Sequence, residues 1–178
     1  ISLTLATHSG LRRKSFLTRL GALAGCAVLI SVSSYFIFGP RWIFFGVLHF
    51  IAVASVLGLG FVRRPRLALV VGIALIVLDR VFDHAVFDQP YLQWLGLMTF
   101  KPPTEDYVPL IPWFGVVLLG IVLGNHVWLR ESPPTLAHWH GTQPLARLLS
   151  LAGRHSLLVY MLHQPLLLGM LWLVRRIL

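Results

Sequence analysis

Charged residues are scarce in this sequence. Asp, Glu, Lys and Arg make up only 12% of its 178 residues, about half the share found in a typical soluble domain. Long stretches carry no charge, and 57% of the residues are hydrophobic. This composition excludes an ordinary soluble domain, and the apolar stretches indicate a protein that crosses a membrane several times.

Acidic residues are the rarer of the charged residues, with six against 15 Lys and Arg. The resulting net charge of +9 would suit a nucleic-acid partner. However, the basic residues cluster at the ends of apolar stretches, where membrane topology explains them. We therefore expect membrane lipids as partners and no nucleic acid.

Cysteine and the common metal and cofactor motifs are almost absent. Cys26 is the only cysteine, so no disulfide can form within the chain. No HExxH, CxxC or GxxxxGK motif occurs. His138 and His140 could contact a metal ion, but two loop histidines are weak evidence for a site. We expect no metal.

Five apolar segments are long enough, or nearly so, to span the ~30 Å hydrocarbon core as helices. They are continuous rather than alternating, which argues against the strands of a barrel. They cover residues 16–38, 42–61, 67–82, 109–129 and 156–174. The sequence therefore predicts an all-α, polytopic transmembrane helix bundle with about five spans, forming a single domain over residues 1–178.

Two long connections, residues 83–108 and 130–155, separate the last three spans. The first connection is acidic and the second is basic. Ten Lys and Arg residues fall on the side of residues 130–155, and five fall on the other side. Because cytoplasmic loops carry an excess of Lys and Arg, we expect residues 130–155 in the cytoplasm and residues 83–108 outside.

Polar residues inside the fifth span form the first candidate site. Ser156, Tyr160, His163 and Gln164 are spaced at i, i+4, i+7 and i+8, which places them on one helical face. Ionisable groups within a span are costly and usually face the interior of the bundle. The stripe therefore indicates either a functional pocket or a seam of hydrogen bonds between helices.

The second candidate site is formed by residues of the second span and of the start of the fourth span. His49 falls inside the second span, and Gly46 beside it would let a neighbouring helix approach closely. At 1.5 Å per residue, His49 should lie ~10 Å below the outer end of that span. Asp106 and Trp113 flank the start of the fourth span. A histidine bonded to a partner helix and a solvated loop acid are the structural alternatives.

Three of these stretches together resemble one family. They read WIFFGVLHFIAVASVL, DYVPLIPWFGVVLLGIVLG and LAGRHSLLVYMLHQPLL in this order. The chain resembles, nearly throughout, the bacterial DUF1624 proteins, which belong with the heparan-alpha-glucosaminide N-acetyltransferase catalytic-domain family of membrane acyltransferases. The resemblance implies a protein of the bacterial inner membrane. It also implies upstream helices with an Asp–x–x–Arg–Gly motif and a catalytic histidine, so we expect an N-terminally truncated member.

The resemblance also implies a reaction. An acyl donor, acetyl-CoA or another acyl-CoA, would react on the cytoplasmic side, and a hydroxyl or amino group of a sugar-like molecule would accept the acyl group. A histidine can take the acceptor's proton. We expect His163, His49 and Asp106 to be catalytic. The substrate-binding residues are expected to be Tyr160, Gln164, Trp113, Arg154 and Arg147. A transporter or a non-catalytic membrane protein is the alternative.

Overall fold

The computed structural model describes residues 2–8, 10, 13–128 and 144–177. The chain divides into two compact units, Ile1–Pro134 and Thr135–Leu178, and each is described by itself. The described residues form helices, turns and irregular segments and contain no β-strand. The expected all-α class is therefore confirmed for this part of the chain.

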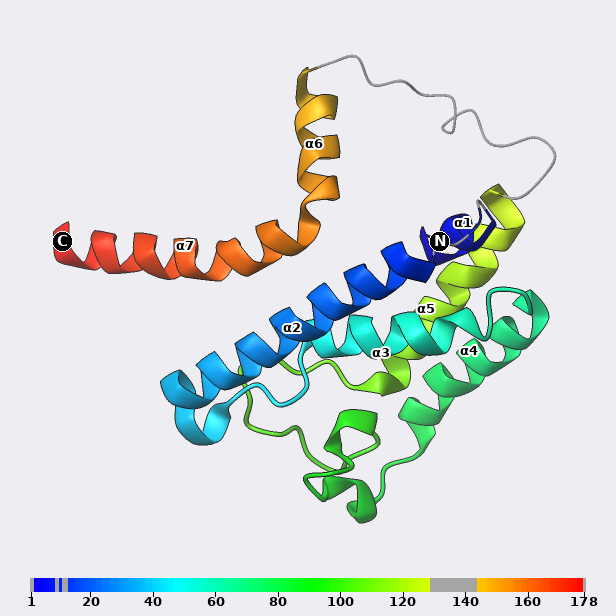
Figure 1. Ribbon diagram of the computed structural model, residues 1–178. Coiled ribbons are helices and arrows are strands. Elements are labelled where there is room, and N and C mark those ends of the chain that lie inside the picture. Colours follow the sequence, from blue (N-terminus) through cyan, green and yellow to red (C-terminus); the bar gives the residue numbers. More distant parts are fainter. Residues whose placement is uncertain (1, 9, 11–12, 129–143, 178) are drawn as a thin grey trace. The chain divides into compact units, whose positions relative to one another are not determined.

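The first unit is built from helices joined by short segments, except between α4 and α5, where a long segment contains only two short 3₁₀ helices (Figure 1). α4 packs most extensively against α5, and α2 and α5 both contact α3. The elements are α1 (Ser2–His8), α2 (Arg13–Phe38), η1 (Gly39–Arg41), α3 (Val47–Leu59), α4 (Pro65–Val81), η2 (Ala85–Asp88), η3 (Gln93–Leu95), α5 (Leu110–Leu123) and the π-helical turn η4 (Gly124–Trp128).

Only part of the expected membrane architecture is confirmed. Among the described residues, one helical stretch, Arg13–Arg41 with 29 residues, is long and apolar enough to cross a membrane. α3 is apolar but has 13 residues, which corresponds to ~20 Å of helix. The described residues therefore do not confirm a bundle of five full spans.

Backbone breaks explain why α3 is shorter than the sequence suggests. Gly39 has φ of +56°, a left-handed conformation that favours glycine, and Pro40 follows it. Residues 42–46 are then non-helical, and α3 begins at Val47 rather than at residue 42. His49 consequently lies in the first turn of α3, ~3 Å from its start, and residues 42–49 do not form the continuous helix on which the expected depth of ~10 Å is based.

Two glycines bring α4 and α5 into close contact. A Cβ atom on Gly115 would lie 2.6 Å from the carbonyl oxygen of Gly72, and one on Gly72 would lie 3.1 Å from that of Gly115. Real Cβ atoms need more room than this, so the backbones approach only because both side chains are absent. Ala68 and Leu118, which flank the crossing, are completely buried.

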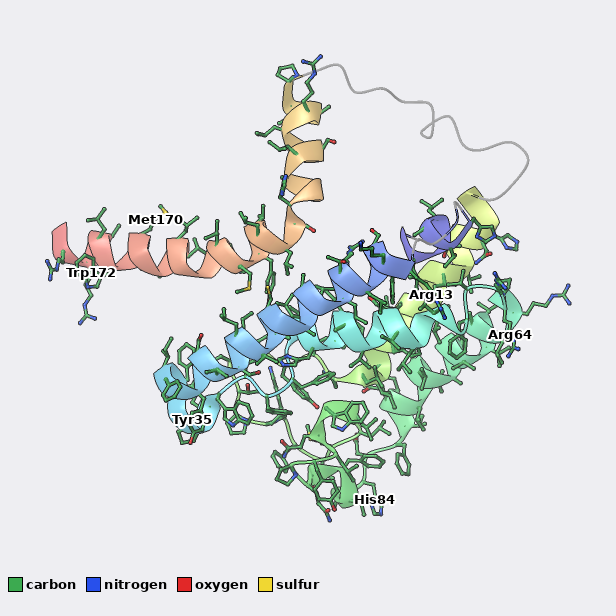
Figure 2. The ribbon with its side chains drawn as sticks, in the orientation of Figure 1. Arg13, Tyr35, Arg64, His84, Met170 and Trp172 are labelled. Carbon is green, nitrogen blue, oxygen red and sulfur yellow. The ribbon has the colours of Figure 1, made fainter. Side chains whose placement is uncertain are left out.

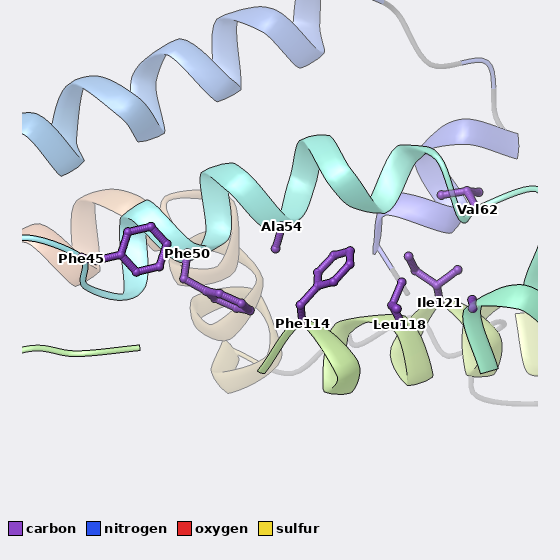
Figure 3. Close-up of a cluster of buried hydrophobic side chains, with 8 residues drawn as sticks. Phe45, Phe50, Ala54, Val62, Phe114, Leu118 and Ile121 are labelled. Carbon is purple, nitrogen blue, oxygen red and sulfur yellow. The ribbon is translucent and has the colours of Figure 1, made fainter. Parts of the chain in front are cut away.

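One cluster of buried apolar side chains joins α3 to this helix pair. Figure 3 shows seven of its members, Phe45, Phe50, Ala54, Val62, Phe114, Leu118 and Ile121. Phe45 belongs to the cluster although it precedes α3. The non-helical segment before α3 is therefore anchored in the core, which fixes the position at which the helix begins.

Charge is distributed unevenly along the first unit. Figure 2 shows Arg13 and Arg64 near one end of the unit and Tyr35 and His84 near the other. The acidic residues described in this unit lie in the last turn of α4 and in residues 83–106, namely Asp79, Asp83, Asp88, Glu105 and Asp106. This polarity agrees with the positive-inside rule if the end with Arg13 is cytoplasmic.

The second unit contains α6 (Pro144–Arg154) and α7 (Ser156–Ile177). α7 corresponds to the expected fifth segment. α6 lies within residues 130–155, which are expected from the sequence to form a connection, and this expectation is wrong for residues 144–154. Leu145, Leu148, Leu149 and Ala152 follow a helical spacing of three and four residues. Pro144 belongs at a helix start rather than a loop.

Candidate functional site

The segment before α5, residues 104–108, is joined to the segment between α2 and α3. The Glu105 amide donates a hydrogen bond to the Arg41 carbonyl oxygen over 3.4 Å, and the two side chains form an ion pair. The Thr104 hydroxyl donates to the Trp42 carbonyl oxygen over 2.8 Å. These bonds bring Asp106 to the start of α3.

Asp106 caps α3 from a distant part of the sequence. Its Oδ2 accepts a hydrogen bond of 3.0 Å from the amide of Val47, the first residue of the helix. A helix start has amides without partners inside the helix, and its positive end attracts a carboxylate. Gly46, the residue before Val47, has no side chain that could do this. Asp106 therefore supplies a cap that the local sequence lacks.

Gly46 is also the residue that makes room for this carboxylate. A Cβ atom at position 46 would overlap Asp106 Oδ2 and would lie 2.9 Å from both Asp106 Cγ and Ile43 Cγ2. From the sequence, Gly46 is expected to admit a neighbouring helix. The structure instead places the Asp106 side chain there, because residues 104–108 run past the start of α3.

The hydrogen bonds of His49 define where its proton lies. The Gly46 amide donates to His49 Nδ1 over 3.3 Å, so Nδ1 is an acceptor and carries no proton. His49 Nε2 lies 3.2 Å from Ser31 Oγ. Ser31 donates its own hydroxyl proton to the Ile43 carbonyl oxygen over 2.7 Å. The Ser31 oxygen must therefore accept from His49, which makes His49 a neutral imidazole with its proton on Nε2.

A second serine completes this connection between α2 and residue 43. The buried Ser34 accepts a hydrogen bond of 2.9 Å from the Ile43 amide and donates one of 3.0 Å to the Ser31 carbonyl oxygen. Both polar groups of Ile43 are thus bonded to serines of α2. Ser31 and Ser34 are not among the residues expected from the sequence. The signal available was their spacing of three residues, one helical turn, inside an apolar helix.

Ser31, His49 and Asp106 are the residue types of a hydrolytic triad, but they are not arranged as one. In a triad the histidine donates from Nδ1 to the carboxylate and accepts the serine proton at Nε2. Here Nδ1 accepts from an amide and Nε2 donates to Ser31. This arrangement does not activate Ser31 as a nucleophile. The nitrogen able to accept a proton is Nδ1, beside the capped start of α3.

Aromatic rings enclose this region. The Phe45 ring lies 5.8 Å from the His49 ring and 5.9 Å from the Trp94 ring, measured between centroids. Tyr107, next to Asp106, donates its hydroxyl proton to the Gln93 carbonyl oxygen over 2.5 Å. Burial raises the pKa of Tyr107 to about 12, and the Asp79 carboxylate adds to this effect. Tyr107 therefore stays neutral at physiological pH.

The candidate residues of the second unit lie on α6 and α7. His163 Nδ1 is hydrogen-bonded to the Tyr160 carbonyl oxygen, and the two rings lie 5.1 Å apart between centroids. A carbonyl oxygen accepts only, so Nδ1 carries the proton and Nε2 is the basic nitrogen. Arg147 is exposed on α6. Gln164 lies on α7 and Arg154 at the end of α6, but their side chains are outside the described part.

The structure therefore brings the candidates together in two groups. His49 and Asp106 meet at the start of α3, and Tyr160 and His163 meet on α7. Trp113 lies near the start of α5 with 50% of its surface exposed. Within the described residues, no group of three or more His, Cys, Asp and Glu could hold a metal ion. The suggested metal contacts His138 and His140 lie outside the described residues.

The sequence matches the family model described as heparan-alpha-glucosaminide N-acetyltransferase, catalytic, over residues 1–165. The chain belongs to this family. No curated protein and no solved structure matches it significantly. Membership of the heparan-alpha-glucosaminide N-acetyltransferase catalytic family indicates an acetyltransferase-type function with acetyl-CoA as the general donor. The family is membrane-associated, in agreement with the apolar helix Arg13–Arg41.

Proposed function

We propose that the protein is an integral-membrane acyltransferase, which moves an acetyl group from acetyl-CoA to a hydroxyl or amino group of a sugar-like acceptor. The family match over residues 1–165 carries this proposal. The protein would lie in the bacterial inner membrane in this proposal, and the polarity of the first unit supports an orientation with Arg13 and Arg64 toward the cytoplasm. In this proposal residues 1–178 act as one transmembrane domain.

The neutral His49 is suited to accept the proton that the reaction releases. The acceptor oxygen or nitrogen forms a bond to the thioester carbonyl carbon, and its proton passes to His49 Nδ1, where it displaces the Gly46 amide. The carbon–sulfur bond then breaks, and the thiolate of CoA leaves and takes up the proton. Asp106 stabilises the transient imidazolium by its negative charge.

His163 is the second base in this proposal. Its Nδ1–H donates to the Tyr160 carbonyl oxygen. In the neutral ring Nε2 therefore carries a lone pair and can accept a proton. Tyr160 and Gln164 would orient the ring or donate hydrogen bonds to the developing oxyanion. Arg147 and Arg154 would bind the phosphates of the donor.

Trp113 is assigned to the acceptor. An exposed aromatic ring near the start of an apolar helix offers a flat apolar surface with one hydrogen-bond donor. Such a surface suits the apolar face of a sugar ring. Trp113→Phe should then raise the KM for the acceptor more than it changes the KM for acetyl-CoA.

The proposal is tested by replacing each histidine separately in the full chain. His49→Ala and His163→Ala should each lower acetyl transfer by roughly 10²-fold, the usual scale for a lost general base. Transfer is measured from radiolabelled acetyl-CoA to a panel of sugars and amino sugars. The matched control is His84→Ala, because His84 is exposed and its ring accepts a hydrogen bond from the amide of Val86, two residues further along the chain.

His163→Asn separates proton transfer from packing. Asparagine keeps a hydrogen-bonding group near the Tyr160 carbonyl oxygen but cannot accept a proton at neutral pH. This variant should fold as well as the parent protein and remain slow. If both histidines can be replaced by alanine with full activity, neither is the base. Solute flux in proteoliposomes without acyl transfer would instead support a transporter.

A further inference from the structure

Ser31 has a hydrogen-bonding arrangement that the proposed reaction does not account for. It lies on α2, and His49 lies on α3, 18 residues further along the chain. The Ser31 oxygen is bonded on one side to His49 Nε2 and on the other to the Ile43 carbonyl oxygen. One hydroxyl group therefore serves as acceptor and donor at the same time, between two separate segments.

The two bonds of Ser31 determine each other. A hydroxyl has one proton, and the 2.7 Å bond to the Ile43 carbonyl oxygen uses it, because a carbonyl cannot donate. The Ser31 lone pair that faces His49 can then only accept. Any proton shared between these two side chains must come from Nε2. A histidine whose Nε2 is protonated and whose ring is neutral has its lone pair on Nδ1.

Ser34 keeps Ser31 and Ile43 in this geometry. It bonds to the Ile43 amide and to the Ser31 backbone carbonyl, and only 4% of its surface is exposed. Ile43 therefore cannot move away from α2 without breaking its hydrogen bonds to the serines. Breaking buried hydrogen bonds costs free energy. Because Ile43 is held in place, its carbonyl oxygen stays where it can accept the hydroxyl proton of Ser31.

We propose that Ser31 is a positioning residue that holds His49 as the tautomer with its proton on Nε2. Nδ1 thereby stays unprotonated at the capped start of α3, where it accepts the 3.3 Å hydrogen bond from the Gly46 amide. The hydrogen bond on one imidazole nitrogen decides the state of the other. The inference about positioning stands on these contacts, and its effect on catalysis rests on the function proposed above.

The tautomer can be observed directly. The full-length protein is labelled with ¹⁵N-histidine and reconstituted in lipid bilayers, and the ring nitrogen shifts of His49 are assigned by difference from a His49→Gln variant. The native protein should show a protonated Nε2 and an unprotonated Nδ1. If the native protein shows a neutral His49 ring with its proton on Nδ1, the proposal is wrong. This result would not require any Ser31 variant.

Three serine variants test the cause. Ser31→Ala removes the acceptor of the Nε2 proton and leaves only the 3.3 Å hydrogen bond from the Gly46 amide to favour the native tautomer. It should therefore change the Nε2 signal and populate the other tautomer in part. Ser31→Thr retains a hydroxyl and should restore the native signals at least in part. Ser33→Ala is the matched control, because Ser33 lies on the same helix but donates to the Leu29 carbonyl oxygen of that helix. The proposal is wrong if Ser31→Ala and Ser33→Ala give the same spectrum as the native protein.

Kinetics give a second measurement. Ser31→Ala should lower kcat by about 10- to 100-fold, the scale found for residues that orient metal-ligating histidines, with little change in either KM. Ser31→Thr should recover much of this loss. If the ¹⁵N signals respond as expected but the native protein transfers no acetyl group to any acceptor, the positioning role stands and the proposed function fails.

Discussion

Replacing Gly46 by alanine is the sharpest test of how α3 begins. The new Cβ atom would overlap Asp106 Oδ2 and would stand 2.9 Å from Ile43 Cγ2. Gly46 has φ of −98° and ψ of −170°, an extended conformation that alanine adopts without strain. Any cost of Gly46→Ala is therefore steric and is not caused by the backbone.

The size of this cost follows from two effects. Overpacking by one methyl group in a filled site destabilises a protein by about 1–3 kcal/mol. If the carboxylate moves aside to relieve the overlap, α3 loses its cap, which costs about 0.5–2 kcal/mol. The combined loss of roughly 1.5–5 kcal/mol corresponds to a fall in Tm of roughly 3–20 °C for a chain of this size.

The assay compares the Tm of purified variants in one detergent. Gly25→Ala is the matched control, since a Cβ atom at Gly25 meets no other atom within 4 Å and alanine favours the helix by about 0.5–1 kcal/mol. The two substitutions should therefore change Tm in opposite directions. An unchanged Tm for Gly46→Ala would show that Asp106 does not lie over this glycine.

A double substitution identifies the partner. Asp106→Ala removes the atoms that a Cβ at position 46 would strike, leaving only Ile43 in the way. Gly46→Ala should consequently cost less in the Asp106→Ala background than in the native protein, by about 1 kcal/mol or more. Additive losses would mean that the two residues do not interact.

Further expectations concern the rest of the first unit. The unfolded chain ionises its tyrosines near pH 10, and folded Tyr107 does so at about 12, so the stability from this buried phenol is complete below pH ~10 and is lost as the pH rises through about 12. Tyr107→Phe should remove that loss, as measured by unfolding at several alkaline pH values. Gly115→Leu should cost about 3 kcal/mol or more, because the struck atom is a backbone oxygen of α4, and a normal Tm would contradict the close helix crossing. In a Cys26→Ser background, an impermeant thiol reagent outside intact cells should label a cysteine at Gln89 and spare one at Ser15, and the reverse pattern would invert the topology.

The sequence predicts some local features of the candidate site correctly. Helical spacing places Tyr160 and His163 on one face of α7, and their rings are in contact. His49 and Asp106 attract notice because charged and ionisable residues are rare in this chain. Periodicity and composition depend on neighbouring residues, so these features can be found without a structure.

The contacts between segments are not predictable in this way. Ser31 and Ser33 lie two residues apart in the same apolar helix. Ser33 bonds to a carbonyl of its own helix, as serine commonly does in apolar helices, whereas Ser31 bonds to Ile43 and His49. Only the packing of α2 on α3 distinguishes the two. The bond from Val47 to Asp106 likewise spans 59 residues and leaves no local signal.

The cap on α3 has a consequence for the order in which the chain matures during synthesis. Translation produces Val47 and His49 long before Asp106, and the interval of 59 residues includes all of α4. Until residue 106 has left the ribosome, the first turn of α3 lacks the carboxylate that satisfies its amide. The helix therefore enters its final surroundings with a frayed start, and the His49 site is completed only when residues 104–108 dock.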